Sequence, residues 1–426
     1  MVSVGRERQS EIYRGGAQGL RPAVPSSWHA LEEAARRAMS PEAWAYIAGS
    51  SGSESTARRN REALDAVRLV PRVLRDVEDR DLSVELFGRR YPTPVIAAPV
   101  GVLDLAHPGG DLAAAEGAAA VGVPFVLSSQ ASVPMERVAA AHPDAPRWFQ
   151  LYWSSSDELV ASFLARAEAI DVDAIVVTLD THVLGWRPRD LDLAFLPFIR
   201  AQGIAQYTSD PVFMRLVAER IETPPAERTR PRLSPATIRT LIAMSKNHPG
   251  GLWRNLRSPV PRASVETFLD VFSRSSLTWE HLAFLREHTT RPIVLKGIQH
   301  PDDARKAIDH GVDGIIVSNH AGRQVDGAIG SAEALPGVIG AVDGRIPVLY
   351  DSGVRSGADV APVLALGAAA ALVGRPYAYG LAIAGAAGVE AVLRNIVAEF
   401  DLVLALTGHR RPGELGRDCL AGRVAP

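Results

Sequence analysis

One short stretch of the sequence places an imidazole and a guanidinium directly after an apolar run. The run is Gly314–Val317, which is rich in β-branched residues and short enough for a strand buried on both faces. His320 and Arg323 follow it within a few residues. A histidine titrates near neutrality and an arginine keeps its charge, so this pair could take up a proton and bind the anion beside it. A polar loop with a surface histidine explains the stretch equally well, so the choice depends on which residues join it.

A second candidate for chemistry is a lysine, because lysine is rare in this chain. Only three of the 46 basic residues are lysine, and Lys296 lies near the end of the apolar run 292–298. Its compact ammonium could stabilise negative charge on a bound cofactor or form a Schiff base with a carbonyl. A salt bridge at the end of a strand is the structural alternative.

The sequence repeats one pattern that could position such groups: a short apolar run, a polar or glycine-bearing turn, and an amphipathic helical stretch. Strands that alternate with helices predict an α/β fold with a parallel sheet. Eight repeats favour a closed (β/α)8 TIM barrel over an open doubly wound sheet, since no G-x-G-x-x-G fingerprint follows any run. The runs are 94–99, 124–129, 147–153, 174–180, 292–298, 314–320, 346–353 and 369–376.

Polar residues gather at the carboxyl ends of these expected strands. Barrels of this kind carry their active sites at that end. The residues are Ser128, Ser129, Gln130, Gln150, Tyr152, Thr178, Asp180, Lys296, Ser318, Asn319, His320, Asp351, Arg355, Gly374 and Arg375. Polar residues scattered at random would not all fall at one end, so the sequence predicts a single site there.

The last two strand ends suggest a phosphate site. Asp351, Gly353 and Arg355 follow the seventh run, and Gly374 and Arg375 follow the eighth. Such barrels often hold phosphate there on backbone amides and arginine. A phosphorylated cofactor or substrate is therefore expected, and glycine turns with solvent-facing arginines are the alternative.

Composition excludes several functional classes. The chain has 426 residues, 47% of them hydrophobic, and a net charge of −2 without a long charged block. A nucleic-acid or membrane-surface partner is therefore not expected, and a small molecule is. A single cysteine, Cys419, excludes an intrachain disulfide and argues against a thiolate metal site, so no metal is expected. No targeting or membrane segment is visible, which is compatible with the cytoplasm.

The remaining segments flank or interrupt the barrel. Residues 1 to about 25 lack periodicity and predict an extended arm, whereas helical spacing over 27–48 predicts two short helices. We assign 1–93 to this N-terminal segment and 94–426 to the barrel. A long insertion after the fourth strand, about 191–278, has helical patterns and is expected to be part lid and part oligomer contact. A C-terminal helix is expected over about 388–406.

Several motifs together resemble one enzyme family. SNHAGRQ, VLKGI, DSGVRSGADV, GRPYA, FQLYW and LTW occur in the order typical of the FMN-dependent α-hydroxy acid oxidases and dehydrogenases. The resemblance implies bound FMN, a small L-α-hydroxy acid substrate, oxygen as acceptor and a homo-oligomer, tetrameric or octameric. Within the family, LDTHVLGWRPRDLDL and YTSDPVF are most similar to the lactate 2-monooxygenases, which implies conversion of lactate to acetate, carbon dioxide and water. The alternatives are an oxidase that releases a 2-oxo acid and hydrogen peroxide, a dehydrogenase with a quinone or protein acceptor, and a flavin-binding barrel without turnover.

The resemblance also implies roles for individual residues. His320 would accept the substrate proton, with Asp180 orienting it. Arg323, Arg187 and Tyr46 would bind the substrate carboxylate, and Tyr152 would lie near the substrate hydroxyl. The residues implied for FMN are Pro99, Val100, Gly101, Ser128, Gln150, Thr178, Lys296, Ser318, Asp351, Gly353, Arg355, Gly374 and Arg375.

Three positions depart from the family pattern. Ala321 stands where glycine is usual, directly after the expected base, and would be strained if that backbone needs a positive φ. Gln130 stands where many relatives have an aromatic residue, and Gly101 replaces the alanine common in oxidases. These departures bear on the base, the substrate pocket and the reactivity with oxygen.

Overall fold

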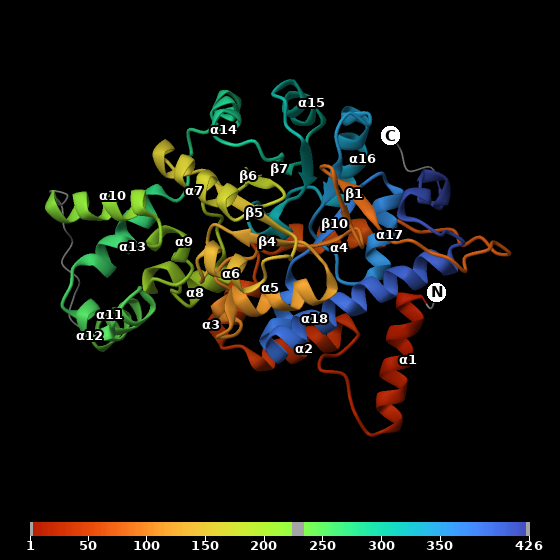
Figure 1. Cartoon of the computed structure of the whole chain (residues 1–426), viewed down its shortest axis with the longest axis horizontal. Helices are drawn as coiled ribbons and strands as arrows, with labels where there is room; N and C mark the ends of the chain where they lie inside the picture. Colours follow the sequence, from red (N-terminus) through yellow and green to blue (C-terminus); the bar gives the residue numbers. More distant parts are fainter. Residues whose placement is uncertain (1–2, 224–233, 423–426) are drawn as a thin grey trace.

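The computed structural model describes residues 3–223 and 234–422 and contains a closed barrel of eight parallel strands (Figure 1). The strands follow one another around the barrel in sequence order, and the last pairs with the first. Each lies within one of the expected apolar runs. They are β3 (Val95–Ala97), β4 (Phe125–Ser128), β5 (Arg147–Tyr152), β6 (Ile175–Thr178), β7 (Ile293–Ile298), β8 (Gly314–Val317), β9 (Val348–Tyr350) and β10 (Ala370–Val373). The predicted (β/α)8 barrel is confirmed.

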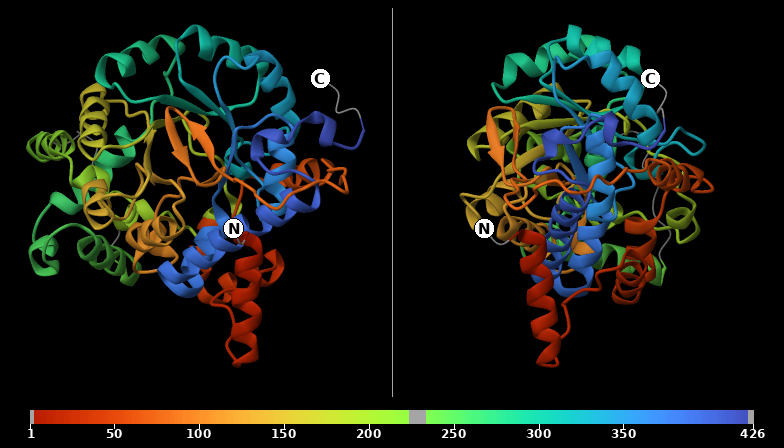
Figure 2. Two further views of the ribbon diagram at one scale, coloured as in Figure 1. Left: turned by 45° about the vertical axis from the view of Figure 1, so that its right-hand side comes forward. Right: turned by 90° about the vertical axis from the view of Figure 1, so that its right-hand side faces the viewer.

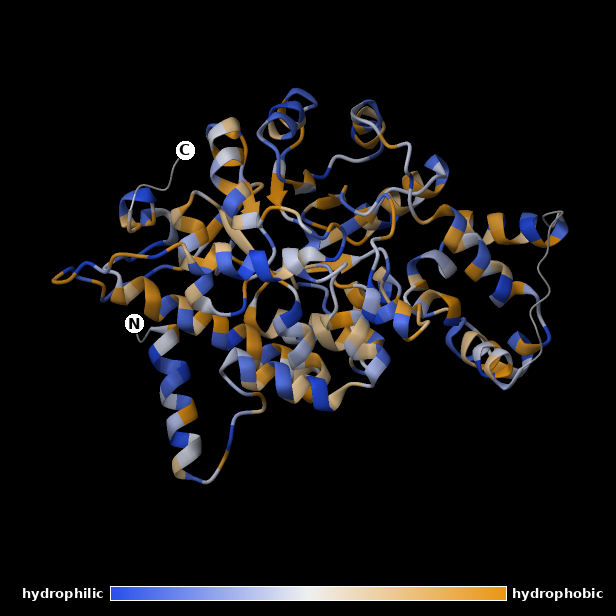
Figure 3. Cartoon of the chain, turned by 180° about the vertical axis from the view of Figure 1, so that it is seen from behind, coloured by the Kyte–Doolittle hydropathy of each residue, from blue (hydrophilic) through white to orange (hydrophobic). Residues whose placement is uncertain are grey.

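The strands are apolar on both faces because both are covered. Val176 of β6 packs inside the barrel with Trp148 and Ile316, whereas its neighbours Ile175 and Val177 face the helices outside. This alternation follows from the two-residue period of a strand. Figure 3 shows these strands as apolar segments at the centre of the molecule. The interior is therefore a packed core, and the site must lie at one end of it.

A hairpin that the sequence did not reveal covers the amino end of the barrel. β1 (Val84–Leu86) pairs antiparallel with β2 (Arg89–Tyr91). Phe87 in its turn and Tyr91 both contact the ring of Trp148 edge-on, with centroid distances of 5.6 and 6.3 Å. The opposite, carboxyl end of the barrel is left for the site.

Helices surround the barrel. They are α5 (Gly110–Val121), α6 (Met135–Ala141), α7 (Asp157–Ala169), α14 (Leu282–His288), α15 (Pro301–Asp309), α16 (Ser331–Val342), α17 (Gly357–Ala365) and α18 (Arg375–Leu406). Short 3-10 turns join some of them. These are η1 (Leu103–Leu105), η2 (Pro197–Arg200), η3 (Trp279–His281), η4 (His320–Gly322), η5 (Pro412–Glu414) and η6 (Arg417–Cys419).

Helix α18 is longer than expected because it begins directly after β10. Non-helical backbone at Ala384 and Gly385 divides it, and the expected helix over 388–406 is its second part. Gly385 has φ +60° and ψ −140°, which a glycine adopts without strain. By length and composition α18 could cross a membrane, but 61% of its apolar window is buried against the rest of the molecule. It is a core helix of the barrel.

The N-terminal residues are helical, so the expected extended arm is wrong. α1 (Val4–Ala17) projects from the body and contacts it near the end of α18 (Figure 2). The amide of Gly5 donates to Oδ2 of Asp401 at 2.8 Å, and a Cβ at Gly5 would lie 2.6 Å from the carbonyl oxygen of Ala398. Tertiary contacts of this kind stabilise a helix that has little apolar periodicity of its own.

Three further helices connect α1 to the hairpin. They are α2 (Trp28–Ala38), α3 (Pro41–Ala48) and α4 (Ser55–Asp65). The first two confirm the pair expected over 27–48. The third was not expected, and it lies beside α16 and the turn η4 that follows β8.

The insertion between β6 and β7 is a lobe of short helices at one side of the barrel (Figures 1 and 2). Its helices are α8 (Pro188–Asp192), α9 (Ala205–Thr208), α10 (Pro211–Glu222), α11 (Pro235–Asn247), α12 (Leu252–Leu256) and α13 (Val260–Val271). Phe198, Tyr207, Phe213 and Phe268 form its aromatic core. Residues 224–233 of the predicted insertion lie outside the described residues. The lobe is therefore folded, and it reaches the barrel mouth through Phe198 and Phe272.

Candidate active site

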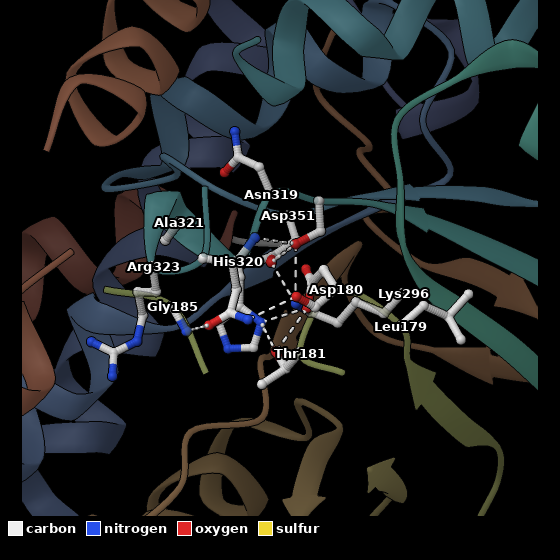
Figure 4. A network of polar contacts seen from close by, with 12 residues as sticks. Leu179, Asp180, Thr181, Gly185, Lys296, Asn319, His320, Ala321, Arg323 and Asp351 are labelled. Carbon is white, nitrogen blue, oxygen red and sulfur yellow. Dashed lines mark hydrogen bonds and ion pairs between the residues drawn. The ribbon is translucent and has the colours of Figure 1, made fainter. Parts of the chain in front are cut away.

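His320 and Asp180 form a hydrogen-bonded pair at the carboxyl end of the barrel. His320 follows β8 and Asp180 follows β6, and Nδ1 of the imidazole lies 2.8 Å from Oδ1 of the carboxylate (Figure 4). The hydroxyl of Thr181 lies 3.1 Å from the same carboxylate oxygen and 3.3 Å from Nδ1. The carboxylate accepts from Nδ1, so Nε2 is the nitrogen left to act on a ligand.

The electrostatics of this pair favour a neutral imidazole beside an ionised carboxylate. Burial lowers the pKa of His320 below its usual value, and this effect exceeds the opposing influence of Asp180. Burial opposes ionisation of Asp180 as well, but the adjacent His320 and the charge of Lys296 hold its pKa below the usual range. At neutral pH, His320 is therefore a base with a free lone pair, and Asp180 can stabilise the imidazolium that forms when it accepts a proton.

The backbone that carries His320 is strained at two successive residues. His320 has φ +57° and Ala321 has φ +54°, both in the left-handed region. The amide of His320 donates to Oγ of Ser318 at 3.0 Å, and the amide of Ala321 donates to Oγ of Ser352 at 3.0 Å. The carbonyl of Ala321 accepts from Ser50 at 3.1 Å. These bonds fix a conformation that glycine would adopt at lower cost.

Two arginines and two tyrosines face the same cavity as His320. The guanidinium of Arg323 donates to the carbonyls of Tyr46 and Gly49 at 2.5 and 2.8 Å and lies 5.2 Å from the ring centroid of Tyr46. Arg187 donates to the carbonyl of Arg323 at 3.2 Å. Burial and the charge of Arg323 lower the pKa of Arg187 to about 10, so Arg187 remains a cation at neutral pH. Burial raises the pKa of Tyr152 to about 12, which keeps its hydroxyl protonated.

Lys296 belongs to a buried network beneath this cavity. Its ammonium lies 3.0 Å from Oδ2 of Asp351 and 3.0 Å from Oγ of Ser318, which donates to Asp351 at 2.6 Å. Burial disfavours the charged form of Lys296, but the charges of Asp351 and Asp180 together have the larger effect and raise the pKa of the lysine. The lysine is therefore charged, which excludes the alternative of a Schiff-base nucleophile in this state.

Two cavities of about 110 and 270 Å³ adjoin at the carboxyl end. Both are lined by Ala321, Asp351, Gly374 and Arg375. The smaller is also lined by Tyr46, Pro99, Val100, Gly101, Ser128, Gln130, Tyr152, Thr181, Arg187, Phe198, Phe272, Lys296, His320 and Arg323. The larger is also lined by Trp28, Trp44, Arg58, Asn60, Arg61, Arg189, Ser352, Gly353 and Arg355. The expected substrate residues therefore lie in one cavity and the expected phosphate residues in the next.

Gln150 of β5 and Thr178 of β6 are expected cofactor residues that line neither cavity. Oε1 of Gln150 accepts from the hydroxyl of Ser128 at 3.2 Å, but its Nε2 is buried without a partner among the described residues. Oγ1 of Thr178 is likewise buried and unpaired. Unpaired buried polar groups are costly. An amide donor, a hydroxyl and the ammonium of Lys296 suit the pyrimidine edge of a flavin, which has acceptors and donors, so the residues fit FMN.

Three further residues support the base and the carboxylate-binding arginines, a role that the sequence did not suggest for them. Gln324 accepts from Arg187 at 2.9 Å and donates to the carbonyl of Asp180 at 2.8 Å, so it links both sides of the site. Ser352 accepts a hydrogen bond from the amide of Ala321, and the hydroxyl of Thr181 lies within hydrogen-bond distance of Asp180 and His320. In the sequence, only their positions next to Asp351 and Asp180 point to these two residues. Among the described residues, no group of three or more potential metal ligands occurs.

The fold and site match known proteins. The model of the FMN-dependent dehydrogenase family matches residues 35–422. Over 413 residues the chain is 41% identical to the FMN-dependent alpha-hydroxy acid dehydrogenase qulF of Penicillium citrinum, covering 97% of this chain and 94% of that protein. It is 41% identical over 383 residues to L-lactate oxidase of Lysinibacillus sphaericus (strain C3-41), covering 89% and 88%. A crystal structure of mandelate oxidase superposes with a TM-score of 0.74 at 34% identity, covering 92% and 97%.

The closed barrel, the histidine base at the end of a strand and the donors that fit FMN together define a flavin-dependent oxidoreductase. The chain belongs to the FMN-dependent dehydrogenase family and is an FMN-dependent α-hydroxy acid oxidoreductase. A mandelate oxidase variant has been solved with an FMN adduct, in agreement with FMN as the cofactor. The expected family, enzyme class and cofactor are thus confirmed. The more specific expectation of a lactate 2-monooxygenase is not supported, because these relatives are named as a dehydrogenase and oxidases. The cytoplasmic location and the homo-oligomer stay predictions.

Proposed function

We propose that the chain oxidises a small L-α-hydroxy acid to its 2-oxo acid and passes the electrons to oxygen, releasing hydrogen peroxide. The substrate loses two electrons and two protons, and oxygen takes up two of each to become peroxide. The observation that carries the proposal is the neutral, carboxylate-oriented His320 facing a cavity that two buried arginines also line. A base and a carboxylate-binding pair are what removal of hydrogen from an α-hydroxy acid requires.

Each residue of the cavity has a defined task in this proposal. The cationic Arg187 and Arg323 bind the substrate carboxylate and fix its orientation. The protonated hydroxyl of Tyr152 hydrogen-bonds to the substrate oxygen. Nε2 of His320 accepts a substrate proton, and Asp180 stabilises the imidazolium. Phe198 and Phe272 of the insertion lobe limit the access of water.

FMN, when bound, supplies the two-electron acceptor. Lys296 would lie at its pyrimidine edge and stabilise negative charge there, and the unpaired amide of Gln150 would find an acceptor. Pro99, Val100 and Gly101 would line the reactive face. The larger cavity, with Gly353 and Arg355, would hold the ribityl phosphate, a task shared with Gly374 and Arg375 of the common wall.

The relatives favour the oxidase over the monooxygenase and leave one competitor. L-lactate oxidase and mandelate oxidase are both named as oxidases, which supports oxygen as the acceptor. The protein qulF is named as a dehydrogenase, which supports a second candidate with a different electron acceptor. In both candidates the acid is oxidised by the same residues, and they differ only in how the flavin is reoxidised.

The substrate is expected to be small. The cavity around His320 measures about 110 Å³, and Gln130, Phe198 and Phe272 are among the residues that line it. Gly101 cannot be enlarged freely, because a Cβ there would lie 3.1 Å from Cβ of Gln130. Acids of the size of lactate or glycolate therefore suit the cavity better than acids with a large side chain.

Two measurements test this function. Anaerobic addition of glycolate, L-lactate and L-mandelate to the yellow protein should bleach the flavin absorbance, and bleaching by none of them would contradict hydroxy acid oxidation. Steady oxygen uptake with equimolar peroxide and 2-oxo acid should follow in air. Bleaching without oxygen uptake would identify the dehydrogenase, and carbon dioxide in place of peroxide would identify the monooxygenase.

A further inference from the structure

Trp28 and Trp44 are two tryptophans on the wall of the larger cavity. Trp28 is the first residue of α2, and its ring lies 5.5 Å from that of Tyr379 on α18. Trp44 of α3 stacks on the same Tyr379 at 5.4 Å. This aromatic cluster fixes the N-terminal helices against the start of α18, so the indole of Trp28 has a defined position at the cavity.

The face of Trp28 is covered by Arg355. The guanidinium carbon of Arg355 lies 4.7 Å from the centroid of the Trp28 ring, which is cation–π geometry. Arg355 belongs to the loop between β9 and α17, more than 300 residues from Trp28 in the sequence. The contact therefore joins the expected phosphate loop to the N-terminal segment.

Arg355 differs from the other four arginines that line this cavity. Each of those already donates to oxygen: Arg58 to the carbonyl of Ser53 at 2.7 Å, Arg61 to Asp359 at 2.9 Å, Arg189 to Glu54 at 2.5 Å and Arg375 to the carbonyl of Gly49 at 3.0 Å. The side chain of Arg355 has no hydrogen bond or ion pair within the described part of the chain. All of its side-chain N–H groups are thus available to an anion, whereas each of the other four arginines has part of its donors occupied.

We propose that Trp28 is a positioning residue for the cofactor: it holds the guanidinium of Arg355 on its indole face, with the N–H groups directed to the FMN phosphate. A stacking partner suits this task because it orients the guanidinium without consuming a donor. It also immobilises a long side chain before the phosphate arrives, which lowers the entropic cost of binding. Trp28 thereby increases affinity for the phosphate and contributes little to affinity for the isoalloxazine ring.

The test compares FMN with riboflavin, which lacks the phosphate. Flavin is removed from the full-length chain, and each ligand is titrated back while the quenching of its fluorescence is followed. For Trp28→Ala we expect the dissociation constant for FMN to rise about five- to twentyfold, the range of a partly desolvated cation–π contact. The constant for riboflavin should change less than twofold. Equal losses for both ligands, or no loss for FMN, would overturn the proposal.

A conservative pair keeps the test decisive if Trp28→Ala folds poorly. Trp28→Phe and Trp28→Leu both fill the space with apolar atoms, but only phenylalanine retains an aromatic face. Trp28→Phe should keep most of the preference for FMN over riboflavin, and Trp28→Leu should lose it. Equal preferences in the two variants would contradict a π contact. Trp253→Ala, at an exposed tryptophan of α12, is the control and should bind both ligands as the unaltered chain does.

A double-mutant cycle shows whether Trp28 acts through Arg355. Arg355→Ala should weaken FMN binding more than Trp28→Ala does. When Trp28→Ala is added to Arg355→Ala, the dissociation constant for FMN should rise by less than about twofold further, because the indole then has no guanidinium to hold. Full additivity of the two losses would overturn the proposed coupling.

Discussion

Nδ1 of His320 lies 2.8 Å from Oδ1 of Asp180, although 140 positions separate the two residues in the sequence. The barrel brings them together because β6 and β8 both pair with β7 and end at the same edge. Gln324 connects the Asp180 loop to Arg187 through its amide, so the base and the carboxylate-binding site are held in one network. The proposed chemistry depends on this arrangement, and four predictions test it.

Activity should rise with pH as His320 loses its proton. Burial lowers the pKa of His320 below its usual value, so the base is protonated and inactive only in the acidic range. We expect kcat/KM for the hydroxy acid to increase with pH, with a half-point below about 6.5, and to be level at neutral pH. The measurement is the rate of anaerobic flavin reduction as a function of pH. A half-point above pH 7 would contradict a base whose buried state is neutral.

Asp180→Asn should slow flavin reduction and move the acidic half-point to lower pH. The carboxylate raises the pKa of His320 against burial, so its loss lets burial lower that pKa further. The imidazolium formed on proton transfer then lacks its counter-charge, and the rate should fall about 100-fold or more. Stopped-flow reduction across pH gives both quantities. A half-point that moves to higher pH would contradict this role.

Arg187→Lys should weaken carboxylate binding. The guanidinium presents two parallel donors to a carboxylate and a lysine ammonium does not. We expect the dissociation constant of an unreactive anion such as oxalate to rise about tenfold to 100-fold, measured from its perturbation of the flavin spectrum. Arg215→Lys, at an exposed arginine of α10, is the matched control and should bind oxalate unchanged. Unchanged binding of oxalate by Arg187→Lys would show that Arg187 does not bind the substrate carboxylate.

Ala321→Gly should stabilise the protein. Ala321 has φ +54° and ψ +34°, where an alanine is strained and a glycine is not. We expect the free energy of unfolding to rise by about 1 kcal/mol in denaturant titrations of the flavin-free chain. Ala218→Gly is the matched control, since Ala218 lies inside α10 and its replacement should destabilise the chain by about 0.5 to 1 kcal/mol. Destabilisation by both changes would show that Ala321 has packing contacts that outweigh the strain.

Much of the barrel and the membership of the site follow from the sequence. Each strand, such as Gly314–Val317, is a short apolar run bounded by polar or glycine residues, which is a local signal. Polar residues such as Lys296 and His320 stand at strand ends, and the barrel rule places those ends together. Helix α1 and the β1–β2 hairpin were missed because tertiary contacts, such as that between Gly5 and Asp401, stabilise them.

The sequence alone therefore determined the fold class, the end of the barrel that bears the site and most of the side chains gathered there, because these depend on periodicity along one strand or helix. The family resemblance implied one pairing, that of Asp180 with His320, and only the tertiary structure decided the others. It shows Arg323 committed to the carbonyls of Tyr46 and Gly49, and Arg355 held on Trp28. Such pairings depend on how the closed barrel orients loops that are distant in sequence, and no local pattern encodes that orientation.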